Sequence, residues 1–277
     1  MELNWLQSLG LGLVSGLTDI LPVSSQAHQT ILLTFFGEDS VAPVTRLVIH
    51  LATLLTVLIS VREQIGRIRS QQKLARMPRR RRNRPVEMTA LMDGKIVGTA
   101  LVPIALMLLL HSITRGINGL LLLAGVSLIN AVVLYLPSLV RTADKDSRMV
   151  SPLEGVFMGL GAGASAIPGL SSIGVSYSVG VVHGMDKKYM VHLALLMHLI
   201  FTAGMIVYDV FDIVNQGMPS VDLMVLAGLA VTALGSIIGT IMGIQGLDRA
   251  ARQDGLTGFS FYSFGVALFT FILYLVV

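Results

Sequence analysis

A short polar motif interrupts the first apolar stretch of the chain, in the run Gly16-Leu17-Thr18-Asp19-Ile20-Leu21-Pro22-Val23-Ser24-Ser25-Gln26-Ala27-His28. Asp19 is surrounded by apolar sequence, where an ionised carboxylate costs roughly 2.5–3.5 kcal/mol on insertion scales, so it needs a partner or a cavity. Ser25 and His28 share one face of a helix that starts at Ser24. A hydroxyl beside an imidazole is the minimum for an activated nucleophile, and a nearby carboxylate could orient the base or hold a divalent cation such as Mg²⁺ or Ca²⁺. Ser25, His28 and Asp19 are therefore candidate catalytic residues, with Asp19 as a candidate metal ligand, although the Ser-x-x-His spacing alone is a weak signal.

A second polar interruption lies roughly half a chain later, in the run Ile167-Pro168-Gly169-Leu170-Ser171-Ser172. Proline ends a helix, serine is a good N-cap for the next one, and the free N–H groups at a helix start suit a phosphate. The predicted phosphate-binding residues of the two motifs are Ser24, Thr18, Gly169, Ser171 and Ser172. Small polar residues that satisfy a broken backbone would explain the serines equally well, and this alternative stays open.

The elements that position these motifs are membrane helices. Hydrophobic residues make up 53% of the chain and charged residues only 13%, with a mean hydropathy of +0.76, whereas a soluble domain carries about a quarter charged residues. Apolar runs approach the ~20 residues that a spanning helix needs. The alternation typical of outer-membrane strands does not occur in them. The sequence therefore predicts an all-α polytopic membrane protein.

Basic residues are concentrated in the connections on one side of the predicted helices. Ten of them fall in a loop over residues 62–92, and further ones lie near residues 141–148, 187–188 and 249–252. By the positive-inside rule this side is cytoplasmic. Six full spans then alternate without conflict, and we expect them at residues 46–61, 93–111, 119–136, 188–208, 221–244 and 260–277. Both termini are predicted to be external.

Two segments, about 3–36 and 155–183, must then enter and leave the membrane on the same side. Each is broken in the middle by one of the polar motifs, so we predict two re-entrant broken-helix pairs, entering from opposite sides. This is the pattern of an inverted-topology repeat whose broken helices meet at the midplane. The repeats cover about 1–140 and 150–277 within one integral membrane domain, 1–277. The alternative is a set of ordinary kinked spanning helices.

The Arg79–Arg82 run could be mistaken for a nucleic-acid-binding patch. No aromatic residue is interleaved with it, which argues against base stacking. Beside a membrane it more readily fixes topology and contacts anionic headgroups. We expect no nucleic-acid partner, and the oligomeric state cannot be read from the sequence.

The two motifs resemble those of the bacterial undecaprenyl-diphosphatase family, also called bacitracin-resistance proteins. The first family motif reads Glu-Gly-x-Thr-Glu-[Phe/Trp]-Leu-Pro-[Val/Ile]-Ser-Ser-[Thr/Ser]-[Gly/Ala]-His, and the second reads Pro-Gly-x-Ser-Arg-Ser-Gly. The resemblance extends over nearly the whole chain, including the long basic loop. It implies a protein of the bacterial cytoplasmic membrane that hydrolyses undecaprenyl pyrophosphate to the monophosphate, and so recycles the lipid carrier of cell-wall synthesis. Its partner is then a polyprenyl phosphate lipid.

This sequence departs from the family pattern at charged positions. The first Glu of the family falls on Ser15, the second is shortened to Asp19, and the Arg of the second motif falls on Ser172. Loss of one preorganised charge-stabilising donor typically costs on the order of 10²–10³ in rate. An alternative is therefore a catalytically degenerate homologue that binds or translocates a phosphorylated polyprenyl lipid. A transporter for an unrelated small solute is a third hypothesis.

The chain has five further histidines. His192 and His198 lie in a predicted span, where each is expected to make an interhelical hydrogen bond, and a role for one of them as a replacement for the missing Arg is a minor alternative. His50, His111 and His183 are expected to be interfacial or packing residues.

Overall fold

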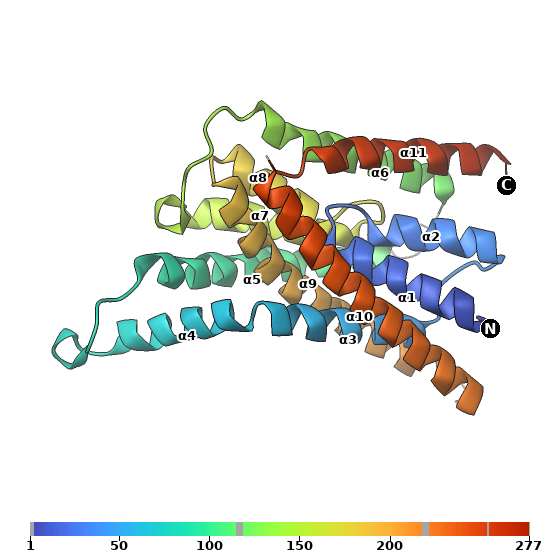
Figure 1. The fold of residues 1–277 in the computed structure, drawn as a ribbon, viewed down its shortest axis with the longest axis horizontal. Coiled ribbons are helices and arrows are strands. Elements are labelled where there is room, and N and C mark those ends of the chain that lie inside the picture. Colours follow the sequence, from blue (N-terminus) through green and yellow to red (C-terminus); the bar gives the residue numbers. More distant parts are fainter. Residues whose placement is uncertain (1–2, 115–118, 218–221, 254, 277) are drawn as a thin grey trace.

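The computed structural model describes residues 3–114, 119–217, 222–253 and 255–276 (Figure 1). The described residues form eleven α-helices and four short 3₁₀ helices. The α-helices are α1 (Trp5–Ile20), α2 (Ser25–Phe36), α3 (Pro43–Ser60), α4 (Arg62–Arg76), α5 (Met88–Thr114), α6 (Leu120–Tyr135), α7 (Pro152–Gly163), α8 (Ser172–Val182), α9 (Lys187–Gln216), α10 (Leu223–Arg252) and α11 (Gly258–Val276).

Six of these helices, α3, α5, α6, α9, α10 and α11, are long and apolar enough to cross a membrane. The prediction of an all-α polytopic membrane protein is thereby confirmed. Helices α9 and α10 have 30 residues each and run past the predicted ends of their spans, 188–208 and 221–244. Helix α9 continues through Asp209 and Asp212 because both carboxylates are buried against partners on α3.

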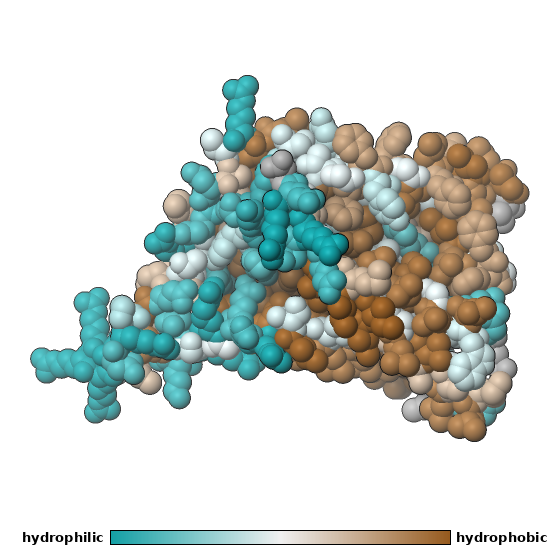
Figure 2. Space-filling view, in the orientation of Figure 1, coloured by the Kyte–Doolittle hydropathy of each residue, from teal (hydrophilic) through white to brown (hydrophobic). Residues whose placement is uncertain are grey.

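The basic segment 62–92, predicted as a loop, is largely helical. Its first part is α4, which packs on α5: the side chains of Ile68 and Gln72 lie against Gly94. Ile68 and Leu74 are buried within an otherwise polar helix, so a few well-spaced apolar residues fix it to the bundle. Figure 2 shows the hydrophilic surface gathered at this end of the molecule and the hydrophobic surface at the other.

Each of the two polar motifs breaks a helix. Helix α1 ends at Ile20 and α2 starts at Ser25, with the Ser24 hydroxyl accepting from Ala27 N at 3.2 Å. The second break separates α7 from α8, where the Ser171 hydroxyl accepts from Gly174 N at 3.1 Å. In Figure 1, α1 and α2 extend from the middle of the molecule to the right, and α7 and α8 extend to the left.

The two breaks meet inside the bundle, where Asn130 of α6 joins them. Its amide nitrogen donates to Pro22 O at 3.4 Å and its amide oxygen accepts from Ser171 N at 3.0 Å. The Ser171 hydroxyl lies 3.4 Å from Leu21 O, which adds a direct contact between the breaks. The backbone groups freed by the breaks therefore find protein partners, as non-helical backbone at membrane depth requires.

Each broken pair begins with a helix, α1 in the first pair and α7 in the second. Glycines bring each of these helices against a spanning helix from the other half of the chain, α1 against α10 and α7 against α5. A Cβ atom added at Gly12 or Gly16 of α1 would lie 2.2 Å from a backbone oxygen of α10. On α7, a Cβ atom at Gly159 would lie 2.7 Å from Ala100 Cα of α5. The two halves are therefore interleaved, while their relation as inverted repeats stays a prediction.

Candidate active site

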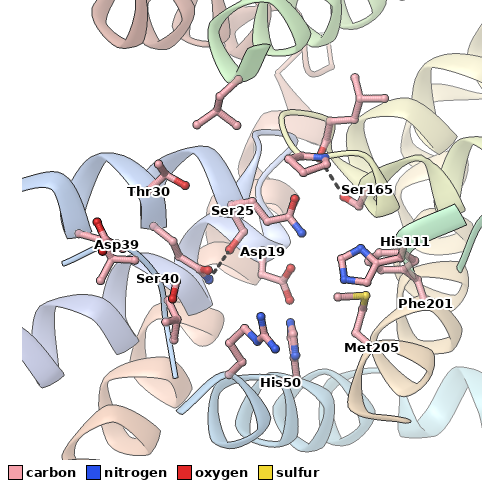
Figure 3. Close-up of a pocket in the computed structure, with 18 residues that line it drawn as sticks. Asp19, Ser25, Thr30, Asp39, Ser40, His50, His111, Ser165, Phe201 and Met205 are labelled. Atoms are coloured by element: carbon pink, nitrogen blue, oxygen red, sulfur yellow. Dashed lines mark hydrogen bonds between the residues drawn. The ribbon is translucent and has the colours of Figure 1, made fainter. Parts of the chain in front are cut away.

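A pocket lies where the two helix breaks meet. Its walls come from the end of α1, one face of α2, the segment after α2, α3, the end of α5, the start of α6, the α7–α8 break and α9. The lining residues are Asp19, Ser25, Gln26, Gln29, Thr30, Leu33, Asp39, Ser40, Val41, Arg46, His50, His111, Leu123, Ser165, Pro168, Leu170, Phe201 and Met205 (Figure 3).

Asp19 lies on the pocket wall in the last turn of α1. Its Oδ2 atom is 3.3 Å from Nε2 of the buried His198, which also lies 3.1 Å from the Thr202 hydroxyl. The geometry between His198 Nε2 and Asp19 Oδ2 is that of an ion pair and not of a hydrogen bond. This buried Oδ2 atom therefore has no hydrogen-bond donor among the described residues. In Figure 3 the carboxylate points into the pocket, toward His50. This orientation fits a group that acts on a bound ligand.

Ser25, the first residue of α2, also lines the pocket. Its hydroxyl accepts from Gln29 Nε2 at 3.2 Å and lies 3.4 Å from Ser15 O. Gln29 Nε2 additionally donates to the Ser15 hydroxyl at 3.0 Å. Ser15, the position where the family motif has Glu, therefore supports the orientation of Gln29 and Ser25.

His28 does not line the pocket, and the structure does not bring it to Ser25. Its Nδ1 atom is 2.7 Å from Ser24 O, and its Nε2 atom is 2.8 Å from the hydroxyl of Tyr262 on α11. Because the Ser24 carbonyl can only accept, Nδ1 carries the proton and Nε2 accepts from Tyr262. The two rings also stack, with centroids 5.7 Å apart. The pairing of Ser25 with His28 is absent from the described residues, while a catalytic role of His28 stays a prediction.

The predicted phosphate-binding residues lie around the pocket without lining it. The hydroxyls of Ser24 and Ser171 cap α2 and α8, and the Thr18 hydroxyl donates to Val14 O at 2.7 Å. Gly169 has a φ of +107°, and a Cβ there would lie 2.7 Å from the side chain of Val126, so this position favours glycine. Ser172 is buried at the start of α8. Their binding of phosphate stays a prediction.

A cluster of charged side chains lies between α3 and α9 and is not among the residues predicted from the sequence. Arg46 and His50, one turn apart on α3, both line the pocket. Asp209 of α9 contacts both, at 3.2 Å from Arg46 Nε and 2.5 Å from His50 Nδ1, and Asp212 lies 2.6 Å from Arg46 Nη2. The spacing gave a signal: Arg and His four apart in one apolar stretch, two Asp three apart in another. Ionisable residues within spanning segments mark functional sites by default.

A divalent cation does not find a ready-made site here. The described residues contain no group of three carboxylate, imidazole or thiolate side chains placed to hold a metal ion. The Oδ2 atom of Asp19, which has no hydrogen-bond donor, could serve as one ligand. A cation would bind there only if a bound phosphate supplied further ligands, as substrate phosphates often do for Mg²⁺. The requirement for a divalent cation stays a prediction.

Comparison with known proteins identifies the family of the chain. Residues 8–269 match the family described as bacitracin resistance protein BacA. An undecaprenyl-diphosphatase of Carboxydothermus hydrogenoformans is 26% identical over 267 residues, covering 94% of each chain. An undecaprenyl-diphosphatase of a Nocardioides species is 30% identical over 215 residues, covering 76% of this chain and 77% of the relative. Undecaprenyl-diphosphatase 1 of Shouchella clausii is 25% identical and covers 98% of this chain. The chain therefore belongs to the BacA family of bacitracin resistance proteins.

Proposed function

We propose that this protein is a membrane phosphatase that hydrolyses undecaprenyl diphosphate to undecaprenyl monophosphate and phosphate. The observation that carries the proposal is the pocket at the two helix breaks, because Asp19 and Ser25 of the first motif both face it. Family membership and the names of the relatives support the same substrate and reaction.

Ser25 is the nucleophile of the proposed reaction. Its Oγ atom forms a bond to the terminal phosphorus, the anhydride P–O bond breaks, and its electron pair leaves with the lipid monophosphate. The Ser25 proton passes to the carboxylate of Asp19. Water then cleaves the phosphoserine, phosphate is released and Ser25 regains a proton. Gln29, which donates to Ser25 Oγ, positions the nucleophile, and positioning is a large part of catalysis in phosphoryl transfer.

The lipid tail would lie against the apolar surface between helices, and the protein would reside in the bacterial cytoplasmic membrane. We propose that the Arg-rich end is cytoplasmic and that the pocket opens toward the external side, together with both termini. In support, the pocket is lined by Ser40 and Val41 after α2, at the end of the molecule away from α4 (Figure 1).

The test is phosphate release from undecaprenyl diphosphate by the detergent-purified protein, with Mg²⁺, with Ca²⁺ and with a chelator. Ser25→Ala and Asp19→Asn should each reduce the rate by roughly 10²–10⁴-fold, because one removes the nucleophile and the other the proton acceptor. The matched controls are Ser70→Ala and Asp248→Asn, which change exposed residues far from the pocket in sequence and element. Undiminished release by the Ser25 variant would contradict the mechanism.

A wild-type protein that releases no phosphate would contradict the proposed activity. The alternative would then be a homologue that binds or translocates a phosphorylated polyprenyl lipid, and the observation that favours it is the serine at position 172 in place of the family Arg. Binding of the intact lipid without cleavage would distinguish such a binding homologue from an inactive preparation.

A further inference from the structure

The charged cluster between α3 and α9 has its cations toward the pocket and its carboxylates behind them. Arg46 and His50 line the pocket, and the side chain of Arg46 is 31% exposed. The side chains of Asp209 and Asp212 are only 2% and 9% exposed, and neither lines the pocket. Among the described lining residues, Arg46 is the one side chain with a permanent positive charge.

The carboxylates hold the two cations in fixed orientations. Asp209 bridges them: its Oδ2 is hydrogen-bonded to His50 Nδ1, and its Oδ1 pairs with Arg46 Nε at 3.2 Å without hydrogen-bond geometry. Asp212 Oδ2 accepts from Arg46 Nη2 at 2.6 Å. The second ring nitrogen of His50 is thereby directed away from Asp209, and Figure 3 shows the imidazole pointing toward Asp19 across the pocket. Within the described part of the chain, no hydrogen bond or ion pair engages Arg46 Nη1. Each cation therefore retains a donor nitrogen for a ligand.

A diphosphate in this pocket needs such donors. Guanidinium groups suit phosphate oxygens, and groups that are already oriented stabilise charge without reorganising during the reaction. Ser172, at the position of the family Arg, is uncharged and does not line the pocket. Arg46 of α3 therefore brings to the pocket wall a positive charge that Ser172, at the start of α8, does not provide.

We propose that Arg46 and His50 bind the terminal phosphate of the lipid diphosphate, and that Asp209 and Asp212 are positioning residues for them. The choice of a diphosphate as the ligand rests on the proposed function; the use of α3 as the phosphate-binding face rests on the pocket and the ion pairs. In this arrangement Asp19 and Ser25 lie on the α1–α2 side of the phosphate and the cations lie on the α3 side.

The competing explanation is that Arg46 only neutralises two buried carboxylates. Removing one partner of a buried ion pair leaves an uncompensated charge, so Arg46→Gln alone could unfold the protein. The double variant Arg46→Gln/Asp212→Asn removes the cation together with one carboxylate and keeps the net charge of the cluster. Arg46→Lys keeps the charge without the planar fork, and Arg148→Gln is the control, because Arg148 also pairs with an aspartate but at an exposed site.

The first measurement is kcat and KM for undecaprenyl diphosphate, beside the melting temperature of the ligand-free protein. The double variant should keep its melting temperature and lose about 10²-fold or more in kcat/KM. Arg46→Lys should recover part of this loss, and Arg148→Gln should match the wild type. Asp212→Asn should raise KM, with recovery in Asp212→Glu. A folded double variant with wild-type kinetics would overturn the proposal.

The second measurement separates this inference from the proposed activity because it needs no hydrolysis. Farnesyl diphosphate, and farnesol as the phosphate-free probe, are added while unfolding is followed, since a ligand that binds the folded state raises the melting temperature. Farnesyl diphosphate should stabilise the wild type and not the double variant. If the wild type binds without releasing phosphate and the double variant does not bind, the activity is wrong and the α3 site stands. Equal stabilisation of both, or no stabilisation of the wild type, overturns the α3 site.

Discussion

His28 illustrates how a residue from a catalytic-looking motif can be engaged elsewhere. The sequence places it one helical turn from Ser25, which predicted a nucleophile–base pair. In the structure both ring nitrogens are occupied, one by the Ser24 carbonyl and the other by Tyr262. The partner on α11 is more than 200 residues away in the sequence, so no local spacing could have identified it. Asp19 and Ser25, by contrast, face the pocket as their positions in a broken helix suggested.

The His28–Tyr262 contact predicts an energetic coupling between α2 and α11. Tyr262→Phe and His28→Ala should each lower the free energy of unfolding, and the double variant should lose less than the sum of the two. The shortfall should be about 0.5–1.5 kcal/mol, the net value of one hydrogen bond, measured by a double-mutant cycle on unfolding in detergent. Strict additivity would argue against the contact. Loss of phosphate release in His28→Ala with full release in Tyr262→Phe would favour the catalytic prediction for His28.

At the scale of helices, local sequence signals were sufficient to predict the two helix breaks and insufficient to predict where the long helices end. Pro22 and the Ser-Ser pairs predicted both interruptions, because helix termination and N-capping depend on neighbouring residues. The composition around Asp209 and Asp212 is typical of a loop and predicts an end of the span at 208. They are helical because their partners are on α3, more than 150 residues earlier. The high charge of α4 predicts a loop, because the few apolar residues that attach the helix to α5 give only a weak periodic signal.

The close approach of α1 and α10 predicts a position-dependent effect of adding a methyl group. A Cβ at Gly16 would lie 2.2 Å from Ser236 O, a backbone atom that cannot turn aside, whereas a Cβ at Gly10 of the same helix meets nothing within 4 Å. Gly16→Ala should lower the free energy of unfolding by about 1–3 kcal/mol, the usual cost of overpacking. Gly10→Ala should be neutral or stabilising, because alanine favours a helix. Equal melting temperatures of the two variants would argue against the close contact.

At the scale of the whole molecule, polarity divides the protein into two ends. The Arg-rich end, with α4 and the segment after it, forms the hydrophilic surface in Figure 2, while the start of α1 and the end of α11 lie at the opposite end in Figure 1. The sequence could predict this division because loop charge follows a simple rule. It could not predict the interleaving of the halves, since helix-to-helix packing of α1 on α10 and of α5 on α7 depends on long-range fit.

Membrane orientation can be tested with reporters. A reporter fused after Val277, which lies outside the described residues, should give an external signal, and one inserted in the segment between Arg82 and Met88 should give a cytoplasmic signal. The physical reason is the concentration of basic residues on the second side. Alkaline phosphatase and green fluorescent protein fusions in bacteria provide the two readouts. A cytoplasmic signal from the C-terminal fusion would invert the proposed topology.

The bridging position of Asp209 carries a consequence for how this protein could have arisen. Loss of both carboxylates would leave Arg46 without the two counter-charges that face it, and loss of Arg46 would leave the buried Asp209 with His50 as the cation paired with it. Single substitutions at these positions are therefore costly, whereas joint replacement is tolerable. Among related chains, Arg46, His50, Asp209 and Asp212 should accordingly be present together or absent together, and intermediates that keep only one side of the pairing should be rare.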